Sequence, residues 1–309
     1  MKYKVYIDGQ AGTTGLQLRQ RLEHHPNIEL LLISEELRKD EAERKRLINR
    51  SDVVFLCLPD EAAKEAVKLV ENPNVCIIDA STAHRTNPLW TYGFPELSQE
   101  HRQEIAVSKR IANPGCHATG FIAGAYPLVK LGIISPDYPF SAHSITGYSG
   151  GGKGMIQEYE ETHRPLAYES PRQYGLSQTH KHLPEMQYVT GISAPPVLSP
   201  IVCDFYCGME TCIPLHSNLF LKKVTKAELT ELLKDFYKDS SFITFAQEET
   251  GFLASNTMAN NNGLTLYLEG NDERMTLISV FDNLGKGASG AAVQNMNIVL
   301  GLNETQGLE

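Results

Sequence analysis

A regular alternation of strand-like and helix-like segments fills the first eighty residues and constrains the fold more than any other feature. Strands are predicted at residues 3–8, 28–33, 53–58 and 75–79, and helices at residues 16–24, 35–50 and 60–70. The strand segments are almost wholly apolar, as strands are when helices cover both faces of a parallel sheet. The alternation therefore predicts an α/β domain built on a doubly wound parallel sheet.

The second half of the chain has a different pattern of predicted strands and helices. A helical segment is predicted at 119–131, strands at 202–207, 212–224, 264–269 and 275–282, and one further helix at 226–238. Long strands with few crossover helices favour a mostly antiparallel sheet in a second, α+β domain. The tail, at 290–302, is again helical.

Composition narrows the class of protein. The 309 residues are 41% hydrophobic and 21% charged, as in an ordinary globular enzyme, and 309 residues suffice for two domains. The net charge of −9 argues against a general nucleic-acid or anionic-membrane binder. A strand begins almost at Met1, which leaves no room for a signal peptide, and no apolar run reaches the length of a membrane span. The six scattered cysteines suggest reduced thiols, and we expect a cytoplasmic enzyme.

One cysteine stands out by its position. Cys116 follows Asn113, Pro114 and Gly115 and precedes small and apolar residues that can start a helix. A thiol at a helix N-terminus feels the positive end of the helix dipole, which favours the nucleophilic thiolate. Cys116 is therefore the candidate nucleophile, against the alternative of an inert small hydrophobic residue.

A nucleophile needs a proton partner, and the segment from His180 to Glu185 offers one. Imidazole titrates near neutral pH, so His180 or His182 can serve as acid/base, with Glu185 orienting the ring. A solvated polar loop is the alternative. A metal site is disfavoured, because no further ligands lie at zinc-like spacing and Cys203, Cys207 and Cys212 have no paired spacing.

A glycine-rich loop joins the first strand to the first helix. Its glycines, Gly9, Gly12 and Gly15, would let the backbone approach a pyrophosphate at the helix N-terminus. The residues that follow this loop do not fully decide between NAD and NADP as the cofactor. Glu35 lies near the position of an NAD-selective acid, whereas Ser34 and Arg38 could hold the 2′-phosphate of NADP, towards which the sequence leans.

Two further glycine-rich segments could contact ligands. The segment 147–154 is either a flexible connection or an anion-binding loop that includes Lys153, and the segment 281–290 suits a cofactor contact or a helix cap. Arg85, His163 and Arg164 are further basic candidates for a substrate carboxylate or phosphate, although each alone is typical of a surface charge.

Taken together, several motifs resemble those of the N-acetyl-γ-glutamyl-phosphate reductase family in its compact form. They occur in the family's order at residues 79–85, 92–97, 111–120, 180–185 and 283–297 and cover nearly the whole chain. The surroundings of Cys116 and the run from Lys286 to Asn297 are the most specific. The spacing of the glycine loop is also the family's usual variant.

The resemblance implies a Rossmann-like NADP-binding domain at 1–115 plus 283–309 and a catalytic and oligomerisation domain at 116–282. It implies Cys116 as nucleophile, with His182 the first choice for acid/base and His180 the second. The cofactor would be NADP(H), and its expected contacts are Gly9, Gly12, Thr13, Thr14, Gly15, Ser34, Arg38, Pro59, Ser81, Asn283 and Lys286. The expected substrate contacts are Arg85, Asn113, Ser149, Gly150 and Glu185.

Two departures from the family pattern bear on substrate preference. His117 replaces the aromatic residue that commonly follows the cysteine, and Thr82, Ala83 and His84 replace residues beside Arg85. His117 and the residues beside Arg85 are expected to line the acyl pocket.

The activity implied is NADPH-dependent reduction of an acyl phosphate through a thioester on Cys116, in arginine biosynthesis. A reductase of N-acetyl-aminoadipyl or aspartyl phosphate is one alternative, and a non-catalytic NADP-binding redox regulator is another. The expected partner is a small-molecule acyl-phosphate substrate, and no nucleic acid, membrane or metal is expected. Family members are usually dimers or tetramers, so a homodimer or homotetramer is expected.

Overall fold

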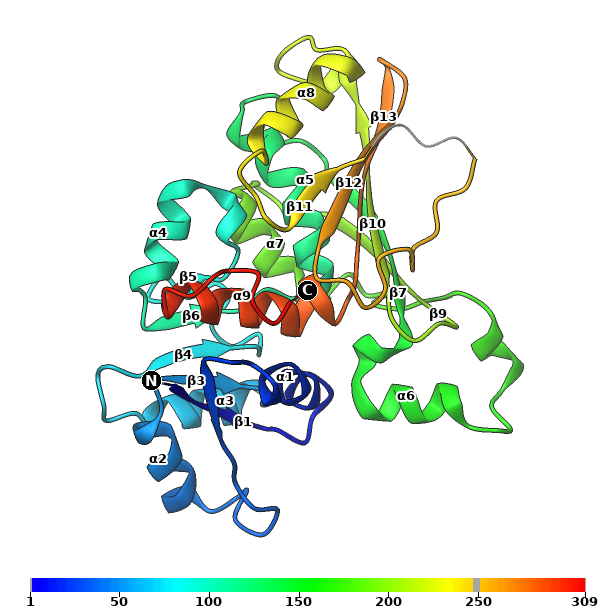
Figure 1. The fold of residues 1–309 in the computed structure, drawn as a ribbon. Coiled ribbons are helices and arrows are strands. Elements are labelled where there is room, and N and C mark those ends of the chain that lie inside the picture. The colour runs from blue at the N-terminus through cyan, green and yellow to red at the C-terminus, as the bar shows by residue number, and fades with distance from the viewer. Residues whose placement is uncertain (1, 247–250, 309) are drawn as a thin grey trace. The chain divides into compact units, whose positions relative to one another are not determined.

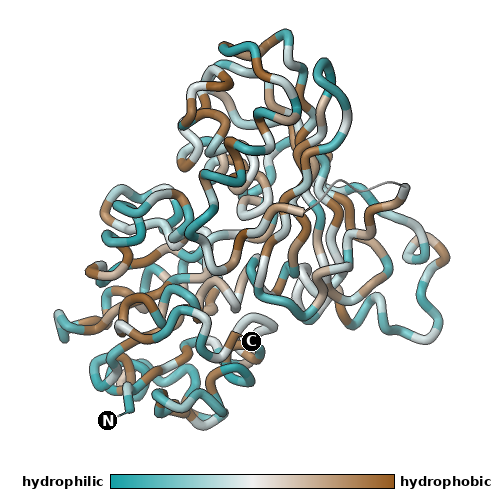
Figure 2. Tube along the Cα trace, turned by 45° about the horizontal axis from the view of Figure 1, so that its top comes forward, coloured by the Kyte–Doolittle hydropathy of each residue, from teal (hydrophilic) through white to brown (hydrophobic). Residues whose placement is uncertain are grey.

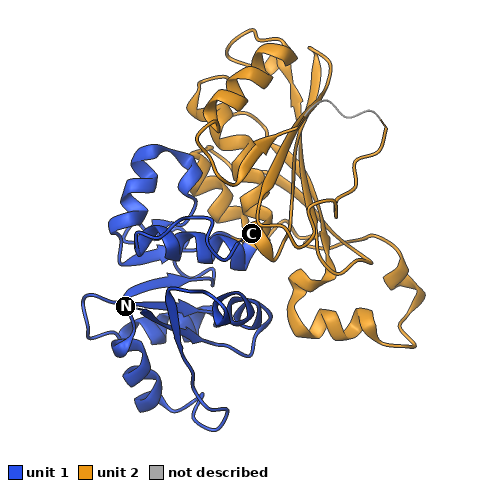
Figure 3. Cartoon of the chain, viewed as in Figure 1, with its two compact units in different colours: residues 1–114, 288–309 blue, residues 115–287 orange. Residues whose placement is uncertain are grey.

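The chain divides into two compact units, which are described separately (Figure 3). The computed structural model describes residues 2–246 and 251–308. The first unit comprises the chain up to Pro114 together with the segment from Ala288, and the second runs from Gly115 to Gly287. Residues 283–287 thus lie with the second unit, whereas the sequence places them with the cofactor-binding domain. Both units alternate hydrophobic and hydrophilic stretches along the chain (Figure 2).

The first unit is built on a six-stranded sheet whose strands are all parallel. The strands are β1 (Tyr3–Asp8), β2 (Ile28–Leu31), β3 (Val53–Leu56), β4 (Cys76–Asp79), β5 (Thr91–Tyr92) and β6 (Arg110–Ala112) (Figure 1). Their order is β2-β1-β3-β4-β6-β5. The chain therefore changes direction across the sheet between β1 and β3, which is where doubly wound sheets bind ligands.

Helices cover this sheet on both faces. They are α1 (Thr13–Glu23), α2 (Glu41–Arg50), α3 (Asp60–Lys68), α4 (Gln99–Val107) and α9 (Gly290–Val299), with a short η1 (Pro95–Leu97). Leu47 of α2 and Ala63 of α3 pack in one buried cluster with Val54 and Leu56 of β3. On the other side Ser289, just before α9, bonds to Arg21 and Gln17 of α1 at 3.1 and 3.0 Å. The predicted doubly wound parallel sheet is confirmed.

One predicted helix of this unit is too long. The helix expected at 35–50 begins only at Glu41, because the side chain of Asp40 accepts a hydrogen bond from the Glu43 backbone N–H at 2.7 Å. That bond is a helix N-cap, and it fixes the start of α2 after a turn that contains Ser34 and Arg38.

The second unit is built on a seven-stranded mixed sheet in the order β11-β12-β13-β10-β7-β9-β8. The strands are β7 (Ser141–Gly147), β8 (Arg172–Gln173), β9 (Val197–Cys203), β10 (Met209–His216), β11 (Ile243–Phe245), β12 (Leu264–Gly270) and β13 (Arg274–Phe281). The pairs β7–β9 and β11–β12 are parallel and the other four are antiparallel. The prediction of a mostly antiparallel sheet is confirmed.

One prediction for the second unit was wrong in position. The strand expected at 202–207 is β9, which starts at Val197 and carries Pro200 at its centre, a residue that weakens the strand signal. The glycine-rich segment 147–154, interpreted from the sequence as a flexible connection or an anion-binding loop, contains the turn η2 (Tyr148–Gly151) and the start of α6 (Gly152–Glu160).

The remaining helices of this unit are α5 (Cys116–Lys130), α7 (Leu183–Thr190) and α8 (Lys226–Phe236), with short turns η3 (Leu166–Glu169) and η4 (Ser217–Leu219). Helix α5 lies very close to the sheet because a Cβ at Gly120 would be 2.4 Å from the Thr211 hydroxyl. The Gly120 carbonyl also accepts a hydrogen bond from the Ser279 hydroxyl at 2.8 Å. The core of the second unit therefore forms between α5 and the strands β10 and β13. In neither unit is a described helix both apolar enough and long enough to cross a membrane.

Candidate active site

Cys116 is the first residue of α5, three residues earlier than the helix start that the sequence predicts. Gly115 precedes it in extended conformation, and no side chain caps the helix at that residue. The first backbone N–H groups of a helix have no partner within the helix and carry its positive dipole end. Cys116 is a free thiol and is partly exposed. The thiol thus lies where a thiolate is favoured and a reagent can reach it.

Glycines let other segments approach this cysteine. A Cβ placed on Gly287 would lie 3.0 Å from the Cys116 Cβ, 3.1 Å from the Asp282 carbonyl and 3.2 Å from a ring carbon of Phe281. Gly287 belongs to a π-helical turn, Gly285–Ser289, within the glycine-rich segment of the C-terminal motif. From the sequence this motif is expected to be a helix cap or a cofactor contact, and the structure adds that one of its glycines packs on the candidate nucleophile.

Three histidines gather beside Cys116. The ring centroid of His117 lies 5.1 Å from that of His180 and 5.7 Å from that of His182, and the last two are 4.8 Å apart. His117 and His182 are buried. The two histidines singled out in the sequence are therefore brought together, and His117, expected to line the acyl pocket, joins them.

The protonation of two of these rings follows from their surroundings. Burial, together with the positive charge of Lys181, lowers the pKa of His180 to about 4. The backbone N–H of His182 donates to Nδ1 of His180 at 3.2 Å, so a neutral His180 carries its proton on Nε2. Burial first, and then the neighbouring His180 and Lys181, lower the pKa of His117 to about 3. Both rings are neutral at neutral pH.

Tyr174 completes this cluster and has no sequence signal. Its hydroxyl lies 2.5 Å from Nε2 of His117, and its ring centroid lies 5.9 Å from that of His180. Burial first, and then the negative charge of Cys116, raise the pKa of Tyr174. Tyr174 is thus a neutral phenol within electrostatic reach of the thiol.

Glu185 lies against the helix that carries Cys116. Its carboxylate is buried and accepts a hydrogen bond from the backbone N–H of Gly115 at 2.8 Å. The sequence assigns Glu185 to the substrate or to a histidine. The structure shows instead that Glu185 fixes the start of α5. Because Glu185 lies in the first turn of α7, this hydrogen bond connects the segment that carries His180 and His182 to the segment that carries Cys116.

Ser149, Gly150 and Asn283, three other predicted residues, meet in the second unit. Asn283 donates to the Ser149 hydroxyl at 3.0 Å and accepts from the Gly208 N–H at 2.9 Å. A Cβ at Gly150 would lie 3.3 Å from the Asn283 amide nitrogen. Lys286, by contrast, is buried with its ammonium 5.4 Å from the ring centroid of Phe242.

The glycine loop of the first unit has the geometry of a phosphate cradle. Gly9 has a φ of +92°, and a Cβ there would lie 2.3 Å from the Cys57 carbonyl oxygen at the end of β3. A Cβ on Gly15 would lie 2.4 Å from the Gly9 carbonyl. Gly12 is the N-cap residue of α1, with no side-chain cap. The loop therefore exposes backbone at a helix N-terminus, which suits a pyrophosphate.

A polar atom in the same loop independently fits a bound phosphate. The hydroxyl oxygen of Thr13, the first residue of α1, is buried without a hydrogen-bond partner among the described residues. Buried hydroxyl groups are normally paired, so an unpaired one beside a helix N-terminus indicates a missing ligand. Thr14 follows in the same first turn.

The other predicted cofactor residues lie beyond the carboxyl ends of neighbouring strands. Pro59 follows β3 as the N-cap residue of α3, and Ser81 follows β4 with its hydroxyl donating to Asp79 at 2.7 Å. Ser34 and Arg38 are exposed beyond β2, and Arg38 pairs with Glu35 at 2.7 Å. Glu35, the acid that the sequence places near the NAD-selective position, is therefore paired with a guanidinium group.

Arg85 and Asn113, both assigned to substrate, are held by their own unit. Arg85 is buried and donates to the Ala80 carbonyl at 2.9 Å. Asn113 donates to the Ala288 carbonyl at 3.0 Å and accepts from Asn295 at 3.3 Å. His84, the departure beside Arg85, stacks on Trp90 at 4.0 Å between ring centroids and bonds to Asp79 at 2.6 Å. These contacts fix the loop after β4.

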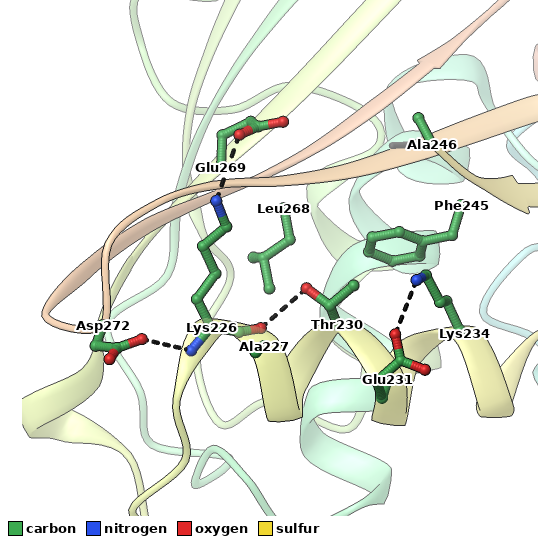
Figure 4. A pocket seen from close by; sticks show the side chains of 10 residues that line it. All are labelled: Lys226, Ala227, Thr230, Glu231, Lys234, Phe245, Ala246, Leu268, Glu269 and Asp272. Atoms are coloured by element: carbon green, nitrogen blue, oxygen red, sulfur yellow. Dashed lines mark hydrogen bonds and ion pairs between the residues drawn. The ribbon is translucent and has the colours of Figure 1, made fainter. Parts of the chain in front are cut away.

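A hollow of about 530 Å³ lies elsewhere in the second unit, between α8 and the strands β11 and β12 (Figure 4). Its charged side chains pair with one another, as in the 3.6 Å contact of Lys226 with Glu269 and the 2.8 Å contact of Lys234 with Glu231. No predicted site residue lines it.

Comparisons with known families agree with this picture. A family model described as the semialdehyde dehydrogenase NAD binding domain matches residues 4–105. A second, described as the semialdehyde dehydrogenase dimerisation domain, matches residues 116–283.

Relatives match over almost their whole length. An N-acetyl-gamma-glutamyl-phosphate reductase 2 from a Nostoc species is 42% identical, with 99% of each chain covered. A protein of the same name from Pseudomonas putida is also 42% identical, with 98% of each covered.

Solved structures share the fold. Aspartate semialdehyde dehydrogenase II from Vibrio cholerae has a TM-score of 0.74 at 16% identity, covering 97% of this chain and 98% of that one. Aspartate semialdehyde dehydrogenase with NADP from Candida albicans has a TM-score of 0.70 at 17% identity, covering 97% and 99%. These likenesses confirm the predicted fold class.

Proposed function

Because the chain belongs to the N-acetyl-γ-glutamyl-phosphate reductase family, we propose that it reduces N-acetyl-L-glutamyl 5-phosphate to N-acetyl-L-glutamate 5-semialdehyde. NADPH is consumed and phosphate is released, as one step of arginine biosynthesis. The observation that carries the proposal is the position of Cys116 as the first residue of α5, beside a buried group of histidines.

Cys116 is the nucleophile of this reaction. Its thiolate attacks the acyl-phosphate carbonyl carbon, and the carbon–oxygen bond to phosphate breaks to leave a thioester. Backbone N–H groups in the first turn of α5 stabilise the oxyanion that forms during attack. Glu185 holds the Gly115 N–H and thereby fixes the direction of that turn.

His182 is the acid/base residue. His180 is a poor proton donor at neutral pH because its pKa is lowered to about 4. Its Nδ1 is also occupied by a backbone N–H. His180 instead orients the segment that carries His182, which takes the proton from the thiol and gives it to the phosphate oxygen that leaves as the thioester forms.

NADP(H) is held by the first unit. Gly9, Gly12 and Gly15 shape the phosphate cradle, and Thr13 and Thr14 bring hydroxyl groups to it. Pro59 and Ser81 border it at the ends of β3 and β4, and Ser34 and Arg38 serve the 2′-phosphate. When bound, the cofactor supplies the hydride that reduces the thioester. Asn283 and Lys286 remain assigned to the cofactor and Arg85, Asn113, Ser149 and Gly150 to the substrate.

The active form is a homodimer or a homotetramer in the cytoplasm. The helices α5 and α8 pack on one face of the second unit's sheet (Figure 1), and the opposite face presents partly exposed apolar side chains. Ile145 of β7 and Ile201 of β9 are directly paired on that face, and Ile278 of β13 lies on the same face beyond β10. Its pairing with a second copy would bury this surface.

The test is turnover of the purified protein in the reverse direction. Phosphate-dependent NADP reduction is measured with N-acetylglutamate semialdehyde, and in parallel with N-acetyl-aminoadipate and aspartate semialdehydes. We expect the first to be preferred and Cys116→Ala to abolish the reaction while NADP still binds. Substantial turnover by Cys116→Ala would refute the covalent mechanism. Preference for another aldehyde would reassign the substrate, and NADP binding without turnover of any aldehyde would indicate a regulator.

A further inference from the structure

His117 has both of its ring nitrogens engaged within the protein. Nδ1 lies 2.8 Å from the Ser144 hydroxyl, and Nε2 lies 2.5 Å from the Tyr174 hydroxyl. The Ser144 hydroxyl in turn lies 2.9 Å from the Thr211 hydroxyl. Four side chains from α5, β7, β10 and the segment after β8 therefore form one hydrogen-bonded chain, which contains the residue that directly follows Cys116 in the sequence.

This chain of hydrogen bonds has two possible directions. His117 is neutral, so it offers one N–H donor and one acceptor nitrogen. Its partners are hydroxyl groups, each of which can donate or accept. In one direction Tyr174 donates to Nε2, Nδ1–H donates to Ser144, and Ser144 donates to Thr211. In the other, Thr211 donates to Ser144, Ser144 donates to Nδ1, and Nε2–H donates to Tyr174.

The second direction releases the Tyr174 proton for another acceptor. Tyr174 then accepts a hydrogen bond from His117 while its own O–H points elsewhere. His117 is the next residue after Cys116, and Tyr174 feels the charge of that cysteine. A thiolate on Cys116 would attract the phenol proton and so favour this direction.

We propose that His117 is a positioning residue, which holds the Tyr174 hydroxyl and directs its proton towards the Cys116 thiolate. The inference rests on the proposed role of Cys116 as nucleophile. It also changes the role expected of His117, the residue that departs from the family pattern. Because both of its ring nitrogens are engaged within the protein, His117 supports the nucleophile instead of contacting the acyl group.

The test measures the pKa of Cys116 without any substrate. Iodoacetamide alkylation of Cys116 is followed against pH by mass spectrometry of its peptide, with Cys116→Ala as the background. The groups that face His117 are Tyr174, His180 and His182, with Lys181 acting at longer range. Replacing a neutral His117 by a neutral side chain removes no charge from this set.

Two variants of His117 form a matched pair. In His117→Gln the amide takes the place of Nε2 and can still donate to Tyr174, whereas in His117→Asn it takes the place of Nδ1 and reaches only Ser144. We expect Tyr174→Phe and His117→Asn to raise the thiol pKa by about one unit, giving about tenfold slower alkylation at pH 7. We expect His117→Gln to restore most of that rate.

Unchanged alkylation profiles in Tyr174→Phe and His117→Asn, with native circular dichroism spectra, would overturn the inference. Equal losses of alkylation rate in His117→Gln and His117→Asn would also overturn the inference, because they would indicate that His117 affects Cys116 through packing alone. A protein that turns over no semialdehyde but shows the predicted alkylation pattern would refute the proposed function and leave the positioning role standing.

Discussion

Gly287→Ala tests whether the C-terminal glycine-rich motif shapes the nucleophile. The new methyl group would lie 3.0 Å from the Cys116 Cβ, 3.1 Å from the Asp282 carbonyl and 3.2 Å from a Phe281 ring carbon. Carbon atoms in good contact are ~3.5–4.0 Å apart, so relief requires a neighbour to shift by a few tenths of an ångström. Asp282 and Phe281 block two directions, and the shift therefore falls largely on Cys116.

The magnitude follows from that displacement. Overpacking of this kind costs about 1–3 kcal/mol of stability. A misplacement of about 1 Å at reacting atoms costs on the order of a hundredfold in rate. Because the shift here is a fraction of that distance, we expect kcat for semialdehyde oxidation to fall about three- to tenfold, with the KM for NADP little changed.

Gly154→Ala is the matched control, because nothing lies within 4 Å of a Cβ at that position in α6. Turnover, the melting temperature and Cys116 alkylation are measured for both variants. We expect the Gly154 variant to keep its turnover and to be as stable as the unaltered protein or slightly more so. Unaltered kcat in Gly287→Ala would refute the argument that this glycine is required for the position of the thiol.

Three other outcomes follow from the structure. Thr13→Val should weaken NADPH binding about five- to tenfold with no loss of stability, since its hydroxyl has no partner among the described residues; equal affinity in a fluorescence titration would contradict this. In the folded protein the pKa of His117 is lowered to about 3 and that of His180 to about 4. Below pH 6.5 the unfolded chain therefore binds protons at these two histidines that the folded protein does not bind. Stability should therefore fall as pH drops from about 6.5 towards 4, by up to about 1.4 kcal/mol per pH unit for each ring, and urea denaturation should show a shallower fall in His117→Gln. Ile201→Lys should convert the oligomer to monomers in sedimentation equilibrium, while Lys153→Glu on exposed α6 should not.

Local patterns account for the parts of the fold that sequence predicts well. The strands β1, β3 and β4 are recognisable because each is a short apolar run ended by glycine, proline or a polar residue. The helix expected at 119–131 is similarly local, although it starts three residues earlier, at Cys116, where Pro114 and Gly115 disfavour a still earlier start. Errors occur where a cap or a proline changes the local signal, as at Asp40 and Pro200.

The site shows the limit of such patterns. His180, His182 and Glu185 could be singled out because they are polar residues close together in one segment. Tyr174 could not, because it is 57 residues from His117 and lies in a segment without periodicity. Ser144 and Thr211 are single hydroxyl residues within strands, and only the pairing of β7 with β10 brings them together.

The sequence by itself determined the order of elements and the family and singled out Cys116 as the candidate nucleophile, because each depends on residues that are adjacent in the chain. Tertiary structure alone decided what surrounds that nucleophile. Glu185 reaches Gly115 across 70 residues, and Gly287 packs on Cys116 from the far end of the same unit. It also decided the environment of His117, since burial and two hydroxyl partners keep this ring neutral and direct both of its nitrogens into the protein.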